Sequence, residues 1–318
     1  MSSEIVIGID LGGTHVRAGA FTSNGEMLAV QETPIEAARG PEPGLRRIQN
    51  LIEAIWNASG AKMLLGIGVG STGPIDPIHG MINNPFTLPG WENVPISAWL
   101  RNAFDVPVAL ENDADVAALG EYWRGAGQSI QRLYAVTVGT GVGTALILDG
   151  QIYRGMDGLH PEGGHVILDP SGPPCYCGAH GCWESLCAGP AIARQARQAD
   201  LHHSILLEMA GGDVEKIDAR LVAEAARLGD PPACAIIDKT AHYFSLGIIN
   251  VIHSITPEMI VLGGGVMKSA DLFLPHLSKA IAAHSIMIPA HRVRIAPAQL
   301  GNYAGLYGAA YTIWSTIK

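Results

Sequence analysis

One loop in the middle of the chain holds the residues whose types and spacing most clearly point to chemistry. His165 is followed, after nine intervening residues, by Cys175 and then by Cys177 and Cys182. One imidazole and three thiolates form the closed tetrahedral ligand set of a structural Zn²⁺ site. The glycines between the last two cysteines allow this short loop to fold back on itself. We predict a structural zinc bound by these four residues; the alternative is three free thiols beside an unrelated histidine.

Two carboxylates flank this cysteine-rich loop. Glu162 lies three residues before His165, and Glu184 lies two residues after Cys182. A loop fixed by zinc would hold both side chains rigidly, where they could bind the neighbouring hydroxyl groups of a sugar. Without that loop, both would be ordinary surface charges.

Two glycine-rich turns are candidate phosphate-binding elements. Asp10 ends an apolar run and is followed by Gly12, Gly13 and Thr14, and a second turn occupies Gly139–Gly143. A carboxylate at a strand end can organise Mg²⁺, and a glycine turn can donate backbone N–H groups to phosphate oxygens. Either turn alone is common in ordinary hairpins. Because the two occur in equivalent places of a repeat, we predict that both bind phosphate.

A third candidate is the run Glu111-Asn112-Asp113, which lies between an expected strand and an expected helix. A carboxylate at such a junction can project into a cleft. The alternative is that Asp113 only caps the helix that begins at Ala114.

The elements that position these residues repeat along the chain. Apolar runs at 5–9, 16–21 and 27–31 predict three antiparallel strands, with the first glycine turn and an Asn-Gly turn between them. The same order recurs about 130 residues later, at 133–138, 144–148 and 151–154. We therefore predict a duplicated domain whose two glycine turns hold a polyphosphate from both sides of a cleft.

The remaining pattern predicts an α/β chain. The 70–95 region, rich in glycine and proline, is expected to be loop. Further strands are expected at 64–69, 108–110, 259–262 and 292–295, and helical segments at 42–58, 96–104, 114–124, 189–227, 232–253, 271–283 and 303–317. The boundary between the halves falls near 115–130.

Several classes of protein are disfavoured. Gly68-x-Gly70-x-x-Gly73 fits the dinucleotide fingerprint formally, but prolines follow where a helix should open, and no Gly-Lys pair forms a Walker A loop. The net charge of −9 argues against general binding to nucleic acid. No basic leader or long apolar stretch is present, so we expect a cytoplasmic protein without a membrane partner.

Together these motifs resemble those of the ROK family (repressor, ORF, kinase), in particular its sugar kinases. The resemblance covers essentially the whole chain. It rests on the glycine turns and the zinc run together with the following motifs: Ser71–Pro74, Leu88–Trp91, Glu111–Asp113, Glu162–His165 and Gly263–Gly265. It implies a two-domain, actin-like (ribonuclease H-like) fold made of βββαβαβα units. The expected domains are 1–118 with the C-terminal helix 303–318, and 119–302 with the zinc loop.

The resemblance also implies a reaction and roles for residues. The expected activity is transfer of a phosphoryl group from ATP with Mg²⁺ to the 6-hydroxyl of a hexose, most simply glucose, with Asp113 as the general base. Sugar contacts are implied for Gly73, Thr87, Asn112, Glu162, His165 and Glu184. Nucleotide and phosphate contacts are implied for Asp10, Gly12, Gly13, Thr14, Gly139, Thr140, Gly141, Gly263, Gly264 and Gly265. A homodimer or homotetramer is expected.

Departures from the family pattern leave the substrate open. Many members have asparagine where this chain has Thr87, and an aliphatic residue where it has Gly163. His160-Pro161-Glu162 is similar to the family's fructokinases, whereas the cysteine run is similar to its glucokinases and N-acetylmannosamine kinases. The alternatives are N-acetylmannosamine, N-acetylglucosamine, fructose, mannose or allose as substrate, or a sugar-sensing regulator without catalysis. Because the first strand is expected from Ile5, we do not expect the N-terminal DNA-binding domain of the family's repressors.

Overall fold

The computed structural model describes residues 4–284 and 287–317. The opening residues Met1–Ser3, on which the expectation of no leader partly depends, lie outside the described residues. The chain divides into two compact units. The first comprises Met1–Gln131, Ala145–His160 and Ala298–Lys318, and the second comprises Arg132–Thr144 and Pro161–Pro297.

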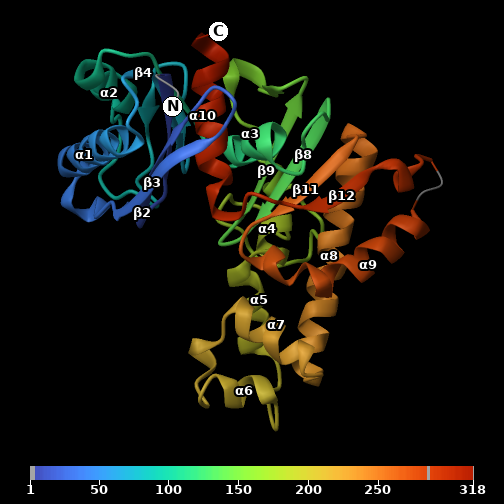
Figure 1. The fold of residues 1–318 in the computed structure, drawn as a ribbon. Helices are drawn as coiled ribbons and strands as arrows, with labels where there is room; N and C mark the ends of the chain where they lie inside the picture. The colour runs from blue at the N-terminus through green and yellow to red at the C-terminus, as the bar shows by residue number, and fades with distance from the viewer. Residues whose placement is uncertain (1–3, 285–286, 318) are drawn as a thin grey trace. The chain divides into compact units, whose positions relative to one another are not determined.

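The first unit is built on a five-stranded sheet with the order β3-β2-β1-β4-β7 (Figure 1). The first three strands pair antiparallel, as their hairpin turns predict, and the last three pair parallel. Their bounds are β1 Glu4–Leu11, β2 His15–Phe21, β3 Met27–Pro34, β4 Met63–Ser71 and β7 Val108–Asn112. Because β1, β4 and β7 run in the same direction, their carboxyl ends lie at one edge of the sheet, where Ser71 is paired with Leu11 on one side and Asn112 on the other, and Asp10 is paired with Gly70.

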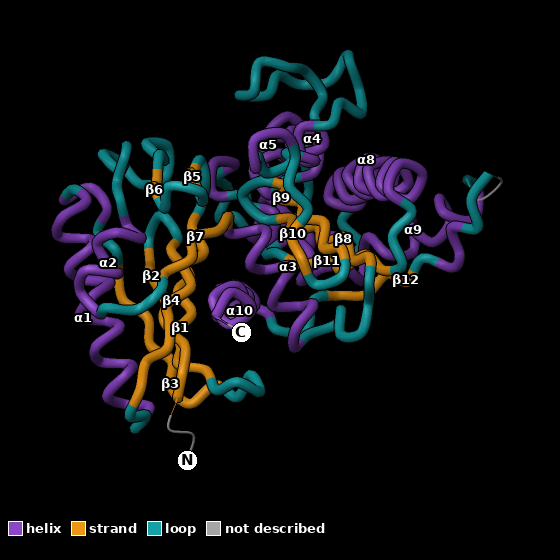
Figure 2. Tube along the Cα trace, turned by 90° about the horizontal axis from the view of Figure 1, so that it is seen from above, coloured by secondary structure: helices purple, strands orange, loops and turns teal. Residues whose placement is uncertain are grey.

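Helices cover both faces of this sheet. Side chains alternate along a strand, so Ile5, Ile7 and Ile9 of β1 pack on one face with α1 (Pro41–Ser59) and α2 (Ile96–Phe104). Figure 2 shows these helices on one side of the strands and α10 (Ala304–Ile317) on the other. Val6 points to the α10 side and packs there with apolar residues of that helix.

The α10 helix lies unusually close to the sheet because glycines line its path. A Cβ at Gly8 would lie 2.2 Å from the carbonyl oxygen of Leu306, and one at Gly68 only 1.8 Å from that of Ala309. A backbone can approach this closely only where no side chain intervenes. Gly8 and Gly68 therefore allow the backbone of α10 to pack directly on β1 and β4. The glycines of β4 serve this packing and are not a dinucleotide-binding loop.

Helix α3 (Asp113–Arg124) follows β7 and packs on α10. A Cβ at Gly308 would lie 1.6 Å from the carbonyl oxygen of Val116, so the backbones of α10 and α3 are also in direct contact. The 70–95 region is mostly loop, as expected, but it also contains a short hairpin of β5 (Ile75–Asp76) and β6 (Met81–Ile82). Two-residue strands are too short for the period-2 pattern that predicts a strand.

The second sheet has the order β10-β9-β8-β11-β12, which repeats the order of the first sheet strand for strand. Its strands are β8 Arg132–Val138, β9 Val142–Leu148, β10 Gln151–Ile152, β11 Met259–Gly263 and β12 Arg294–Pro297. The pairs β8–β11 and β11–β12 are parallel, and β9–β10 is antiparallel. The predicted duplication is therefore confirmed at the level of topology.

The helices of the second unit follow the expected segments with two differences, one of which is that the short helix α4 (Trp183–Cys187) was not predicted. The helical segment over 189–227 is three helices, interrupted by loops in which Gly211 and Gly212 take positive φ. Ser204 caps α6 and Asp218 caps α7. The helices are α4 Trp183–Cys187, α5 Gly189–Gln198, α6 Ile205–Met209, α7 Ala219–Arg227, α8 Pro231–Ile255 and α9 Ala270–Ala283.

Single 3-10 turns connect several elements of both units. They lie at Ala37–Arg39, Met156–Gly158, Gly163–His165, Val214–Lys216, Val266–Ser269, Ala290–Arg292 and Gly301–Tyr303. Among the residues that the structure describes, none of the helices combines the length and apolar character needed to cross a membrane.

Candidate active site

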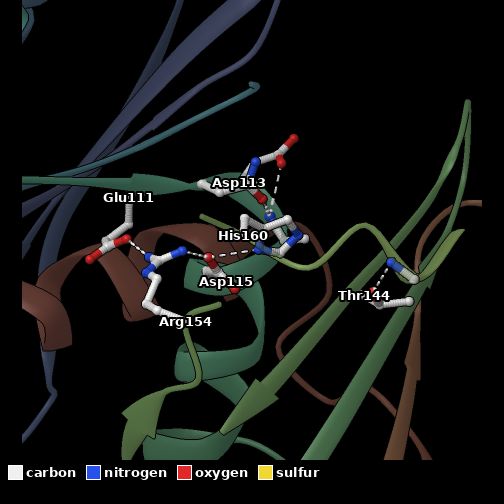
Figure 3. Close-up of polar contacts among 9 residues, drawn as sticks. Glu111, Asp113, Asp115, Thr144, Arg154 and His160 are labelled. Atoms are coloured by element: carbon white, nitrogen blue, oxygen red, sulfur yellow. Dashed lines mark hydrogen bonds and ion pairs between the residues drawn. The ribbon is translucent and has the colours of Figure 1, made fainter. Parts of the chain in front are cut away.

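The junction of β7 and α3 positions the candidate base, Asp113. Asn112 occupies the N-cap position, and its side-chain oxygen accepts a hydrogen bond from the Ala114 N–H at 2.8 Å. Asp113 is the first residue of the helix, and its Oδ1 lies 2.8 Å from the same N–H, as Figure 3 shows. Asn112 therefore occupies the N-cap position of α3, so Asp113 is not needed as the cap.

The surroundings of Asp113 change its acidity. Burial raises the pKa of this carboxyl group from 3.8 to about 6, although the Ala114 N–H opposes the rise. The negative charges of Asp10 and Asp115 raise the pKa further, and the nearby ring of His160 lowers it. Such a group is a stronger base than an ordinary aspartate, yet it is still mostly ionised at neutral pH.

A buried ionic network lies beside this carboxylate (Figure 3). Asp115, whose side chain is 1% exposed, accepts from Arg154 Nη1 at 2.6 Å, and its Oδ2 lies 3.0 Å from His160 Nδ1. Arg154 also pairs with Glu111 at the end of β7. The network ties the segment after β10 to the first turn of α3, which carries Asp113.

Asp10 ends β1 near two other groups of the first unit. Arg17 of β2 approaches its carboxylate with Nη1 3.5 Å from Oδ2. A Cβ at Gly305, in the first turn of α10, would lie 3.1 Å from the carboxyl carbon of Asp10. Burial raises the pKa of Asp10, and Arg17 opposes that shift. A partly buried carboxylate of this kind fits a hard divalent cation, which prefers oxygen ligands.

Among the candidate sugar residues of the first unit, Thr87 lies against the first glycine turn, and Gly73 lies against Asn112. A Cβ at Gly13 would lie 2.7 Å from the carbonyl oxygen of Thr87, and one at Gly73 would lie 3.2 Å from Nδ2 of Asn112. Gly12 N–H donates to the His15 carbonyl at 3.0 Å and closes the turn around Thr14. The structure thus gathers Gly13, Thr87, Gly73 and Asn112 near the carboxyl edge of the sheet.

Thr87 is held by a residue that sequence reasoning missed. Asn84 is fully buried, and its Nδ2 donates to Oγ1 of Thr87 at 2.6 Å and to Oγ1 of Thr72 at 3.0 Å. Its Oδ1 accepts from the backbone N–H groups of Phe86 and Thr87. Asn84, which lies three residues before Thr87 in the sequence, therefore holds the Thr87 hydroxyl by a hydrogen bond.

The four predicted metal ligands lie together in the second unit. The ligand atoms of His165, Cys175, Cys177 and Cys182 are all within 4.8 Å of one another. Cys175 Sγ lies 3.5 Å from His165 Nδ1, and the sulfurs of Cys177 and Cys182 are 3.5 Å apart. Donors around a tetrahedral Zn²⁺ with Zn–S bonds of ~2.3 Å lie roughly 3.5–3.8 Å apart, so this donor set fits the ion.

Tyr176 adjoins both this cluster and the candidate sugar residues. Its hydroxyl lies 3.1 Å from Nε2 of His165, the ring nitrogen that faces away from Cys175. The same phenol interacts with Glu184, and Glu162 acts on it through its charge. Glu162, His165 and Glu184 therefore surround one exposed tyrosine side chain.

The absence of a side chain at Gly163 is explained by Thr144 and Tyr134, which leave no space for a Cβ. A Cβ at this position would lie 2.5 Å from Oγ1 of Thr144 and 2.8 Å from the hydroxyl of Tyr134. The Gly163 N–H donates to the same Thr144 oxygen at 3.1 Å, as Figure 3 shows. The departure from an aliphatic residue thus follows from the hydroxyl groups that this chain places on β8 and β9.

The candidate nucleotide-binding residues of the second unit form a second group. Gly139 N–H donates to the Gly141 carbonyl at 2.9 Å, which closes the turn that carries Thr140. Gly264, at φ +89, would bring a Cβ within 2.4 Å of the Val138 carbonyl, and a Cβ at Gly139 would lie 3.9 Å from the Gly265 nitrogen. The turn after β11, which begins at Gly263, therefore lies against the turn after β8.

Sequence reasoning missed several residues that support the candidate site. Asn84, Arg154, Asp115 and Tyr176 carry no motif that assigns them a role, and His160 was noted only in a run similar to that of fructokinases. The buried ionic network joins residues distant in sequence: Arg154 is 39 residues from Asp115, and His160 is 45 residues from it. Only the buried position of Asp115 in an otherwise amphipathic helix could have indicated that it has a partner.

Comparison with known proteins places the chain in a family. The model described as ROK family matches residues 6–315. The chain belongs to the ROK family. Its two sheets of equal topology, with helices on their faces, are the actin-like fold that the motifs predicted.

Several relatives and solved structures are similar along almost their whole length. The glucokinase of Thermotoga maritima is 33% identical over 97% of this chain and 96% of that protein. The ROK hexokinase of Thermus thermophilus superposes with a TM-score of 0.83 at 32% identity, covering 97% of both chains. A ROK family glucokinase from Streptomyces griseus, in complex with glucose and AMPPNP, gives 0.77 at 31% identity, covering 96% of this chain and 98% of that one.

The relatives include regulators as well. The xylose repressor of Caldicellulosiruptor bescii is 28% identical over 95% of this chain, which corresponds to 76% of the repressor.

Proposed function

We propose that this chain is an ATP-dependent sugar kinase that phosphorylates the 6-hydroxyl group of a hexose, with glucose as the favoured substrate. The observation that carries the proposal is Asp113, a buried carboxylate of raised pKa at the first position of α3, directly after β7. Support comes from the similarity to the glucokinase of Thermotoga maritima and to the glucokinase from Streptomyces griseus solved with glucose and AMPPNP.

Asp113 is the general base of the proposed reaction. It accepts the proton of the sugar hydroxyl as that oxygen attacks the γ-phosphorus, and the bond to the β,γ-bridging oxygen breaks to release ADP. Because the transition state of phosphoryl transfer is loose, positioning and neutralisation of charge contribute more than the strength of the base. A pKa near 6 still helps, since it lies close to the working pH of a cytoplasmic enzyme.

The sugar contacts in this proposal are those that the family resemblance implies. Asn112, Gly73 and Thr87 contact the sugar on the Asp113 side. Glu162, His165 and Glu184 bind its other hydroxyl groups, because each offers an oxygen or nitrogen that can hydrogen-bond a diol. The buried amide of Asn84 donates a hydrogen bond to the Thr87 hydroxyl.

ATP and its metal are assigned to the glycine turns. Gly12, Gly13 and Thr14 in one turn, and Gly139, Thr140 and Gly141 in the other, offer backbone N–H groups to phosphate oxygens. Gly263, Gly264 and Gly265 allow the nucleoside to approach the backbone. Asp10 would hold Mg²⁺, which neutralises phosphate charge when bound. His165, Cys175, Cys177 and Cys182 would hold a structural Zn²⁺ that fixes their loop.

A sugar panel tests the proposal. Purified protein is given ATP and Mg²⁺ with glucose, mannose, fructose, allose, N-acetylglucosamine or N-acetylmannosamine in turn, and ADP release is followed. Glucose is expected to give the highest kcat/KM. If another sugar is preferred, the kinase assignment stands and the glucose assignment is wrong. If no sugar raises ADP release above the background ATPase rate, the kinase proposal fails.

A sugar-sensing regulator is the second candidate, because the xylose repressor of Caldicellulosiruptor bescii matches nearly the whole chain. Such a protein would bind a sugar without transferring phosphate and would change its affinity for DNA or a protein. Sugar binding by calorimetry with no ADP release in the panel would favour it.

We also expect a cytoplasmic protein that forms a homodimer or homotetramer. Light scattering on the purified protein tests the oligomeric state.

A further inference from the structure

Helix α4 and the first residue of α5 contact the second glycine turn at its two ends. Glu184, the second residue of α4, accepts a hydrogen bond through Oε2 from the N–H of Val142 at 2.9 Å. Gly189, the first residue of α5, donates its N–H to the carbonyl of Gly139 at 2.8 Å. The turn of Gly139–Val142 is thus held between two bonds that come from one short stretch of chain.

These contacts are close enough to define the shape of the turn. A Cβ at Gly141 would lie 2.4 Å from Oε2 of Glu184, and a Cβ at Gly189 would lie 3.1 Å from the carbonyl oxygen of Gly139. Glycine turns have more conformational freedom than any other backbone, so a turn that binds phosphate gains affinity when it is ordered beforehand. Because the Val142 N–H already donates to Glu184, it is not available to a phosphate oxygen. Phosphate would therefore bind the other N–H groups of the turn.

The same stretch begins at the metal cluster. Cys182, one of the four candidate zinc ligands, occupies the N-cap position of α4, and its carbonyl accepts from the Leu186 N–H at 3.2 Å. Trp183 and Leu186 are buried and anchor α4 in the core of the second unit. A displacement of Cys182 would therefore move Glu184, and with it the glycine turn.

We propose that Glu184 is a positioning residue for the phosphate-binding turn, in addition to its proposed contact with the sugar, and that α4 couples the cysteine cluster to nucleotide affinity. The inference rests on the proposed function of the turn. A glutamate that served only a sugar hydroxyl would have no need to bind the Val142 N–H, and its loss would leave nucleotide affinity unchanged.

The test measures binding of AMPPNP with Mg²⁺ by calorimetry in the absence of sugar. Glu184→Ala removes the acceptor of Val142 and is expected to weaken AMPPNP binding by roughly 10-fold or more, as for a lost hydrogen bond to a charged group. Glu184→Gln keeps an oxygen acceptor and is expected to stay within about 3-fold of the parent protein. Glu208→Ala, at an exposed position of α6, is the matched control and is expected to have no effect.

A second variant and a second measurement keep the result independent of folding. Gly189→Ala pushes a methyl group against the Gly139 carbonyl and is expected to weaken AMPPNP binding without touching any sugar contact. Hydrogen exchange of the Gly139–Val142 amides should quicken in Glu184→Ala and not in Glu184→Gln. Metal content is measured in every variant, and all should retain the metal of the parent protein.

The outcomes separate this inference from the kinase proposal. Unchanged AMPPNP affinity in Glu184→Ala, with sugar affinity lost, overturns the positioning role and leaves the kinase proposal intact. Weakened AMPPNP binding in Glu184→Ala and Gly189→Ala, in a protein that phosphorylates no sugar, supports the positioning role and rejects the kinase. Equal weakening by Glu184→Gln and Glu184→Ala also overturns it, because the retained acceptor should have preserved the turn.

Discussion

His160 Nδ1 lies 3.0 Å from Oδ2 of Asp115, and this pair joins the last residue of a chain segment to the helix that carries Asp113. His160 is the point at which the chain leaves the first unit, because Pro161 already belongs to the second. Two residues further on lies Glu162, a candidate sugar ligand. The Asp115 network therefore ties His160, the last residue of its segment in the first unit, to the helix that carries the candidate base.

Replacing the base tests its catalytic role directly. In Asp113→Asn we expect kcat to fall by about 10²- to 10⁴-fold, because the sugar hydroxyl loses its proton acceptor. The sugar Kd, measured by calorimetry, should change by less than about 5-fold, since an amide still hydrogen-bonds a hydroxyl group. Equal loss of turnover and of sugar binding would mean that Asp113 is a structural residue.

The raised pKa of Asp113 predicts how the rate depends on pH. A base must be ionised, so its contribution is present above a pKa of about 6 and is lost as the pH falls through that value. At pH 5 about one tenth of the groups would be ionised, and kcat/KM should fall about tenfold from its plateau. Circular dichroism at pH 5 controls for unfolding. A kcat/KM that stays flat down to pH 5 would contradict the raised pKa.

The Asp115 network should contribute strongly to stability. Asp115→Asn leaves Arg154 and His160 without their buried anion, and we expect a loss of about 3 kcal/mol in the free energy of unfolding, as for other broken buried ion pairs. Urea denaturation measures it. Glu42→Gln, which breaks the exposed pair with Arg46, is the control and should cost less than about 1 kcal/mol. Equal losses in the two variants would show that the buried network has no special weight.

The cysteine cluster should be distinguishable from the other thiols. Cys177→Ser is expected to lose most of the bound zinc, determined by elemental analysis, and to weaken sugar binding, because the loop between His165 and Glu184 loses its anchor. Nucleotide affinity should fall by a smaller factor, through α4. Cys234→Ser, outside the cluster, should change neither quantity. Full zinc content in Cys177→Ser would remove the proposed ligand set.

The close packing of α10 on the sheet can be tested by adding one methyl group at Gly68. Gly68→Ala would place a Cβ 1.8 Å from the Ala309 carbonyl oxygen, and we expect a loss of roughly 3 kcal/mol or more, or failure to fold. Gly155→Ala meets only the Leu159 carbonyl at 3.4 Å, so it should stay within about 1 kcal/mol of the parent protein. Thermal unfolding compares the two. A stable Gly68→Ala protein would contradict the close packing of α10.

Local patterns predicted most of the secondary structure. The helix over 96–104 has the bounds of α2, and the paired runs of apolar residues are the antiparallel strands β1, β2 and β3. These elements are set by turn residues and apolar periodicity, which act over a few neighbouring positions. The interruption of 189–227 was missed because alanine-rich and polar stretches there continue a helical pattern through the glycines at 211 and 212.

The candidate site was predictable in part for the same reason. The candidate metal ligands and the glycine turns have fixed local spacing, and the structure gathers the four candidate ligands as the spacing predicts. Arg154 and Asp115 were not predicted to interact, because the folded arrangement brings them together from positions 39 residues apart. The bond from Glu184 to Val142 spans 42 residues, and no motif announces it.

The position of α10 has a consequence for the order in which the protein can be built. The sheet beneath this helix is made from residues near the start of the chain, whereas the helix is supplied almost a full chain length later. A nascent chain emerging from the ribosome would therefore display the bare glycine backbone of β1 and β4, and the apolar side chain of Val6, until α10 has been synthesised. Closure of that surface must await α10, so the first unit begins to fold before its last helix is available.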